Sequence, residues 1–182
     1  MKILVLGLGN PILGDDGVGI RAAALVRARL PPDSLVEVDE DYWGGLRLME
    51  RLAGYDRAIL IDAVCTGQHA PGTVLHLGPD DLPTQHTASA HDVNLPTALR
   101  LAEEMHVKMP AIEIIAVEAE NVLEFADRCT PAVEAALPAT VQAVLEAVTG
   151  GGQRGRGVEG DREEFAPAGR DSNLVCRKLE AL

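Results

Sequence analysis

The sequence predicts an α/β sandwich with a mostly parallel sheet of about five strands. Continuous apolar runs without polar alternation, such as residues 2–8 and 57–64, are typical of strands buried on both faces of a parallel sheet. Segments whose apolar residues recur at spacings of three and four lie between these runs. Strand and helix therefore alternate along the chain, which favours a sheet covered by helices.

The expected elements cover most of residues 1–149. We expect strands at residues 2–8, 35–39, 57–64, 73–77 and 111–117, and helices at residues 17–30, 45–52, 94–105 and 131–148. The segment 73–77 is the weakest strand candidate, and we expect it at an edge of the sheet.

The domain prediction is one α/β domain at residues 1–149, which is an ordinary size for a single domain. From residue 150 the composition changes, because six of the eleven residues 150–160 are glycine and charged residues follow. Such a segment buries too little apolar surface to offset the entropy lost on ordering. We therefore expect residues 150–182 to be a flexible tail outside the fold.

Charge and cysteine usage narrow the expected partners and location. The formal net charge of −12 argues against nucleic acid as a partner, because nucleic acid is a polyanion. The three cysteines show no CxxC or metal-knuckle spacing and fit a reducing cytoplasm. The apolar start of the chain is too short for a secretory signal or a membrane span. We expect a cytoplasmic protein without membrane or nucleic-acid partners.

Carboxylates gather where the predicted strands end. Asp15 and Asp16 follow the first strand, residues 39–41 follow the second, and Asp62 lies near the end of the third. Ligands of open parallel sheets bind outside the carboxyl ends of the strands. The sequence therefore predicts an acidic site at this edge of the sheet.

The first turn, GLGNPILGDDGVG at residues 7–19, is not a dinucleotide site. The third glycine of the G-x-G-x-x-G pattern is replaced by Ile12, and two adjacent carboxylates would repel a pyrophosphate. Helix capping explains Asp15, but it explains Asp16 less well. We expect the glycines to leave room for a cation or a bulky ligand near the backbone. No nucleotide cofactor is expected.

Asp62 and the histidines leave two alternatives open. A carboxylate at the end of a buried strand either accepts hydrogen bonds from loop amides or binds a ligand. His91 lies close to a predicted helix start, and His86 precedes it in the same loop. Asp16, Asp62 and one histidine would form an O,O,N set that suits zinc, nickel or iron. HExxH, GxSxG and Cys–His patterns are absent from the sequence.

Five motifs occur in an order that resembles the hydrogenase maturation endopeptidases. The motifs are GLGNPILGDDGVG, ILIDAV, APGTV, SAHDVNLPTAL and TPAVEAALP, and the resemblance covers about residues 1–148. It implies a three-layer sandwich in which helices flank a twisted sheet. It also implies that the protein removes a short C-terminal extension from the large-subunit precursor of a nickel–iron hydrogenase after nickel has been inserted.

The resemblance also implies the site residues. The family's metal-binding positions fall on Asp16, Asp62 and His91, and the two aspartates are the candidate catalytic carboxylates. The metal would be nickel, supplied by the precursor's cysteines. The family commonly has an Asp-x-Gly-Thr segment after the second strand, where this sequence reads EDYWGG with Glu40 at the apparent Asp position. We expect Glu40 and Gly45 to contact the precursor.

Two other functions compete with this one. A nickel-dependent maturation chaperone would bind the precursor through the same three residues without cutting it. Peptidyl-tRNA hydrolases also begin with GLGNP, but this chain continues with ILGDDGVG and is too acidic to favour tRNA. The catalytic step has two alternatives as well, because either the metal activates water or a carboxylate acts as general base.

Overall fold

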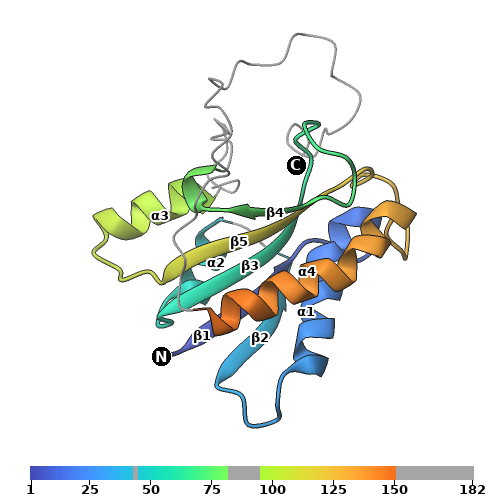
Figure 1. The fold of residues 1–182 in the computed structure, drawn as a ribbon. Helices are drawn as coiled ribbons and strands as arrows, with labels where there is room; N and C mark the ends of the chain where they lie inside the picture. The colour runs from blue at the N-terminus through green and yellow to red at the C-terminus, as the bar shows by residue number, and fades with distance from the viewer. Residues whose placement is uncertain (43–44, 82–94, 151–182) are drawn as a thin grey trace, which may run out of the picture.

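The computed structural model describes residues 1–42, 45–81 and 95–150, and it shows one twisted sheet between helices (Figure 1). The sheet has five strands in the order β2-β1-β3-β5-β4. The strands are β1 (Ile3–Leu8), β2 (Val36–Asp41), β3 (Arg57–Val64), β4 (Val74–Leu77) and β5 (Ala111–Glu118). β1 pairs in parallel with β2 and β3, and β3 pairs in parallel with β5. β4 is antiparallel to β5 at one edge, which confirms both the mostly parallel sheet and the edge position expected for residues 73–77.

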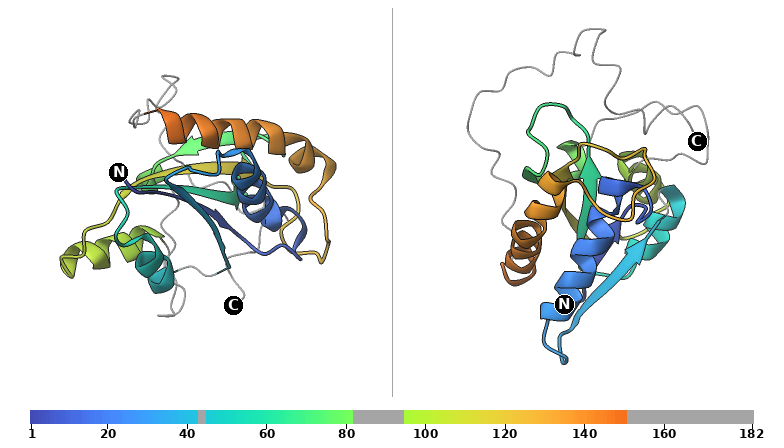
Figure 2. Two further views of the ribbon diagram at one scale, coloured as in Figure 1. Left: turned by 90° about the horizontal axis from the view of Figure 1, so that it is seen from below. Right: turned by 90° about the vertical axis from the view of Figure 1, so that its right-hand side faces the viewer.

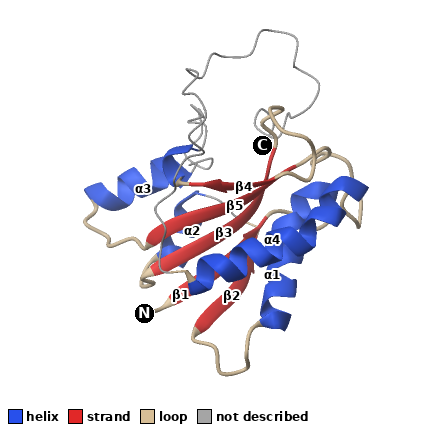
Figure 3. Ribbon diagram, viewed as in Figure 1, coloured by secondary structure: helices blue, strands red, loops and turns tan. Residues whose placement is uncertain are grey.

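Helices cover both faces of the sheet, as the views in Figures 2 and 3 show. α1 (Val18–Arg29) and α4 (Pro131–Thr149) pack on one face, and α2 (Gly45–Leu52) and α3 (Leu95–Glu104) pack on the other. Two short 3-10 helices complete the elements, η1 (Gly14–Gly17) and η2 (Pro79–Asp81). The predicted three-layer sandwich is confirmed.

The central strand β3 explains the uninterrupted apolar runs of the sequence. Ile59 and Ile61 belong to the core shared with α1 and α4, whereas Ala58 and Leu60 belong to the core shared with α2 and α3. Successive side chains of a strand point to opposite faces, so a sheet covered on both sides requires apolar residues at every position.

Helix α4 is long and apolar enough, by length and composition, to cross a membrane. Its side chains Val133, Leu137 and Val141 are buried in the core against α1 and the sheet. A core helix passes the same length and composition test, so we assign α4 to the core of the sandwich.

The glycines of the first turn bring protein backbone together, which corrects the expectation that they leave room for a ligand. A Cβ at Gly19 would lie 2.3 Å from the carbonyl oxygens of both Leu8 and Ile61. A Cβ at Gly9, where φ is +127°, would lie 1.8 Å from the carbonyl oxygen of Asp16. The space beside these glycines is already filled, so α1 can start directly against the ends of β1 and β3.

We predict that Gly19→Ala destabilises the fold by about 3 kcal/mol, because the new methyl group would overlap two strand carbonyls. Gly78→Ala is the matched control, since the nearest atom to its Cβ is an Asp81 oxygen at 3.4 Å. Urea unfolding monitored by circular dichroism measures both. Equal midpoints for the two variants would show that α1 can move away from the sheet at little cost.

The domain should be stable without the residues that follow Gly150. Helix α4 ends at Thr149, where the amide of Gly150 donates to the carbonyl of Glu146 at 2.7 Å. Of the predicted tail, residues 150–182, all but Gly150 lie outside the described residues. Both faces of the sheet are covered by residues up to 150, so a chain that ends at Gly150 should keep its Tm within about 3 °C. Calorimetry tests this. A larger drop would mean that residues 151–182 stabilise the domain.

Candidate functional site

The candidate site lies at the carboxyl ends of the neighbouring strands β1 and β3. The strand that follows β1 in the chain lies on one side of this pair, and the strands that follow β3 lie on the other side. From β1 the chain passes through α1 to β2 on one side, and β3 lies next to β5 on the other side. This is the position at which open α/β sheets bind ligands. The turn after β1 contains η1, and η1 contacts β3. The first turn and the end of the third strand are therefore neighbours, as predicted.

Asp16 is the buried carboxylate of this turn. Its side chain is in η1 with a residue exposure of 2%, and its Oδ2 accepts a hydrogen bond from the amide of Asn10 at 2.9 Å. The carbonyl of Asp16 lies against Gly9, where a Cβ would clash. Its carboxylate is thus held by the same turn that leaves β1.

Asp62 lies near the end of β3 and is partly buried. By the alternation of the strand it lies on the α2 and α3 side, since Leu60 packs there. Its Oδ1 accepts from the amide of Ala63 at 2.8 Å. The two alternatives for Asp62 were hydrogen bonds from amides and binding of a ligand. A hydrogen bond from a neighbouring amide is observed, and ligand binding by Asp62 stays a prediction.

His91 lies outside the described residues, and so does His86. The first described residue after them is Leu95, which packs in the core on the α2 and α3 side, the side of Asp62. Within residues 1–42, 45–81 and 95–150, no three His, Cys, Asp or Glu side chains form a group that could hold a metal. The predicted O,O,N set depends on a residue beyond this part of the chain, so it stays a prediction.

The two expected substrate contacts lie in β2 and at the start of α2. Glu40 is in β2 rather than in the turn after it, and its Oε1 forms an ion pair with Arg27 Nη1 of α1 at 3.0 Å. It therefore lies on the α1 side of the sheet, whereas Asp62 lies on the opposite side. Gly45 is the first residue of α2. Their contact with a substrate stays a prediction.

Asp15 joins three segments that are distant in the sequence. The residue is fully buried, and its carboxylate accepts four hydrogen bonds. Three donors are the amides of Glu120 at 2.9 Å, Asn121 at 3.0 Å and Thr130 at 2.6 Å, and the fourth is the Thr130 hydroxyl at 3.0 Å. The amide of Asp15 donates to the Asn121 carbonyl at 2.9 Å. Asp15 thus ties η1 to the loop between β5 and α4, a larger role than helix capping.

Glu118 is a second buried carboxylate of this edge, and the sequence analysis missed it. It ends β5 with an exposure of 2% and accepts from the amides of Thr66 and Gly67, both at 2.8 Å, and from the Thr66 hydroxyl at 2.7 Å. Glu118 therefore orders the loop after β3. The sequence does contain a pattern that could have identified Glu118, because Glu118 follows an apolar run as Asp62 does.

Cys129 is a free and buried thiol next to the same turn. Burial raises the pKa of this thiol, and its Sγ lies 3.6 Å from the carbonyl oxygen of Gly14, to which it donates. A protonated thiol is a poor nucleophile, so Cys129 has a packing role here.

Comparisons with known proteins agree with the fold and with the motif resemblance. A family model described as hydrogenase maturation protease matches residues 26–147. The hydrogenase 2 maturation protease of Escherichia coli is 31% identical over 153 residues, which are 81% of this chain and 91% of that protein. The hydrogenase expression/formation protein HoxM of Azotobacter vinelandii is 29% identical over 170 residues, with 92% of this chain and 82% of that protein covered.

Solved structures show the same similarity in three dimensions. The hydrogenase maturating endopeptidase HybD from Escherichia coli superposes with a TM-score of 0.70 and 30% identity, covering 81% of this chain and 92% of that chain. The hydrogenase 2 maturation peptidase from a Thaumarchaeota archaeon gives a TM-score of 0.60 and 28% identity, covering 81% of this chain and 98% of that one.

The free energy of unfolding tests whether Asp15 ties η1 to the loop between β5 and α4. Asp15→Ala would leave three amides and one hydroxyl without their acceptor, so we predict a loss of about 3–5 kcal/mol in the free energy of unfolding. Asp127→Ala removes an exposed carboxylate from the same loop and should change stability by less than about 0.5 kcal/mol. Urea denaturation distinguishes the two, and similar losses would contradict the role assigned to Asp15.

Proposed function

The chain belongs to the hydrogenase maturation protease family and is an endopeptidase, and we propose that its substrate is the large-subunit precursor of a nickel–iron hydrogenase. The protein removes the C-terminal extension of that precursor after nickel has been inserted. The nickel enters the site as part of the substrate, held by the precursor's own cysteines.

One observation carries this proposal. The buried carboxylate of Asp16 is in η1, and η1 contacts β3, whose end carries Asp62. Two carboxylates on neighbouring elements attract a cation, and oxygen ligands accept divalent metals. Asp15 and Glu118 each bind several amides of distant loops and thereby order those loops. Asp16 and Asp62 also accept hydrogen bonds from amides, so their assignment rests on their position at the edge of the sheet. Asp16 and Asp62 are the pair we assign to the metal-bearing substrate.

We assign His91 as the third ligand. Asp16, Asp62 and His91 supply two oxygens and one nitrogen, so the set is incomplete without the thiolates of the precursor. An incomplete set explains how the protein distinguishes a nickel-loaded precursor from an empty one. The nickel-free precursor offers nothing for these residues to bind.

The reaction is hydrolysis of one peptide bond. Water adds its oxygen to the scissile carbonyl carbon, the carbon–nitrogen bond breaks, and a proton passes to the leaving amine. Two assignments fit the proton transfer. In one, Asp16 or Asp62 takes a proton from the attacking water as general base and passes it to the leaving amine. In the other, the nickel of the precursor would lower the pKa of a water, and the hydroxyl that adds to the carbonyl would supply the proton of the amine. Asp62→Asn keeps the shape of the side chain and removes the base, so it tests the carboxylate.

The peptidyl-tRNA hydrolase alternative is replaced by the family assignment. We place the reaction in the cytoplasm, with the precursor as the macromolecular partner. The net charge of −12 supports the absence of a nucleic-acid partner. The burial of α4 in the core supports the absence of a membrane partner.

We predict that the protein shortens a nickel-loaded precursor and leaves a nickel-free precursor intact. Mass spectrometry of each precursor, before and after incubation, detects the lost C-terminal peptide. His91→Ala should lower the rate at least about 100-fold without unfolding, whereas His86→Ala, a histidine five residues away, should be nearly silent. Asp16→Glu should keep partial activity, because it changes only the reach of the carboxylate.

Three results would count against parts of this function. Efficient cleavage of the nickel-free precursor would exclude recognition of nickel. A stable complex with an uncut nickel-loaded precursor would support the chaperone alternative. Loss of activity in His86→Ala but not in His91→Ala would reverse the ligand assignment while leaving the protease function in place.

A further inference from the structure

Three exposed apolar side chains lie on two adjoining loops beside the site. They are Ile12, Leu123 and Phe125, with exposures of 56%, 52% and 82%, and we call them the apolar loop patch. Ile12 is in the turn after β1, and the other two are in the loop between β5 and α4. The amide of Ala126 donates to the carbonyl of Ile12 at 3.1 Å, so the two loops are directly bonded. The right-hand panel of Figure 2 shows them side by side.

The loop between β5 and α4 is held together by internal hydrogen bonds. Asn121 Oδ1 accepts from the amides of Leu123 and Glu124, at 3.2 and 3.1 Å, and its Nδ2 donates to Glu124 Oε2 at 3.0 Å. At the base of the loop, the amides of Glu120 and Asn121 are held by Asp15. A loop with this many internal bonds has a defined shape. Its backbone bonds are therefore satisfied while Leu123 and Phe125 stay exposed.

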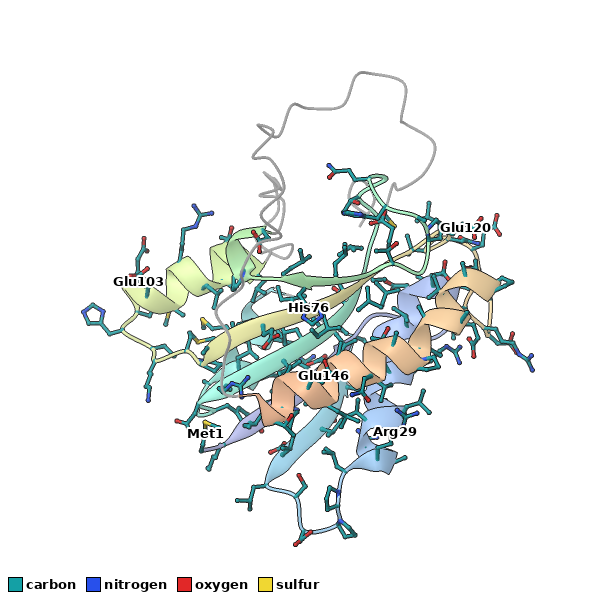
Figure 4. The ribbon with its side chains drawn as sticks, in the orientation of Figure 1. Met1, Arg29, His76, Glu103, Glu120 and Glu146 are labelled. Atoms are coloured by element: carbon teal, nitrogen blue, oxygen red, sulfur yellow. The ribbon has the colours of Figure 1, made fainter. Side chains whose placement is uncertain are left out.

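One side of this loop is buried and the other is exposed to solvent. Val122 is 2% exposed and anchors the loop, whereas Leu123 and Phe125 face solvent. Phe125 is one of only two phenylalanines in the chain. An apolar patch with a charged rim is typical of a protein interaction surface. The rim here is mostly acidic, with Glu120, Glu124 and Asp127 exposed on the same loop beside Arg128, and Figure 4 shows Glu120 beyond the end of β5.

The apolar loop patch is continuous with the candidate site. The amide of Asn10 holds the carboxylate of Asp16 at 2.9 Å, and Asn10 Oδ1 accepts from the amide of Ile12 at 3.2 Å. Asn10 therefore bonds both to Ile12 of the patch and to the carboxylate of Asp16. The patch is therefore close enough to Asp16 to contact a polypeptide whose metal binds there.

We propose that the apolar loop patch docks the precursor, through a segment that carries apolar side chains flanked by basic ones. This inference rests on the proposed function, since it takes the precursor as the partner. The apolar part of the segment covers Phe125 and Leu123, and its basic residues face the acidic rim. Docking holds the precursor in the orientation in which its nickel reaches Asp16 and Asp62. The patch contributes to binding and does not take part in bond cleavage.

The test is the kinetics of cleavage of the nickel-loaded precursor by Phe125→Ser and by the double variant Leu123→Ser/Phe125→Ser. We expect KM to rise about 10-fold for the single variant and further for the double one, with kcat unchanged. Leu35→Ser is the matched control, because Leu35 is 86% exposed but precedes β2, at the opposite end of the strands. Its KM should equal that of the unchanged protein. Added salt should raise the KM of the unchanged protein, since the rim is charged.

Unchanged KM in the double variant, in a chain that cleaves normally and keeps its circular dichroism spectrum, would overturn the docking proposal. A dimer of the unchanged protein that the double variant dissociates, with no change in KM, would assign the patch to a second copy of the chain and would also overturn it. If the unchanged protein binds the precursor without cutting it, the proposed function fails separately. Calorimetric Kd values then test docking, and equal values for the unchanged protein and the double variant would overturn it.

Discussion

The buried carboxylate of Asp15 is the interaction on which the arrangement of the site depends. One side chain with no exposed surface connects η1, the loop after β5 and the start of α4 through four hydrogen bonds. A buried charge of this kind is tolerated only when donors surround it. Those donors come from residues 120–130, more than 100 positions away in the sequence. The turn that carries Asp16 is therefore fixed by the loop between β5 and α4, which is distant in the sequence.

The carboxylates at the carboxyl ends of the strands have two different roles. Asp15 and Glu118 are each surrounded by amides and a threonine hydroxyl, so they shape the loops. Asp16 lies in η1, which Asp15 ties to the loop after β5, and Asp62 lies in β3, which is paired with β1 and β5. The apolar loop patch is supported by the same bonds, because Asp15 holds the base of its loop. The proposed metal site and the proposed docking surface thus share one structural support.

The periodicity of the sequence was sufficient to predict the layers, the five strands and the weak edge strand, because burial on both faces leaves a clear pattern in a parallel sheet. The ends of two strands were less predictable. The strands β2 and β5 continue through acidic residues, Glu40 and Glu118, which pair with Arg27 and with a loop. Tertiary contacts set these ends, and local propensity does not report them.

The site was predictable in part, for a physical reason. The rule that ligands bind at the carboxyl ends of strands groups Asp16 with Asp62 from sequence alone. It does not reveal which carboxylates order the loops, since the donors to Asp15 are backbone amides that any residue could supply. The expectation that the glycines of the first turn leave room for a ligand was wrong for a similar reason. Their neighbours are carbonyls of Leu8, Asp16 and Ile61, which only the folded chain brings close.

The central claim is that Asp16, Asp62 and His91 complete the coordination of nickel held by the precursor. X-ray absorption at the nickel edge tests it most directly, on a precursor whose scissile bond has been made uncleavable by substitution. Adding the protein should bring new oxygen and nitrogen scatterers into the nickel shell, and Asp62→Asn should remove part of that change. A nickel spectrum that stays the same while gel filtration shows the complex has formed would contradict the account.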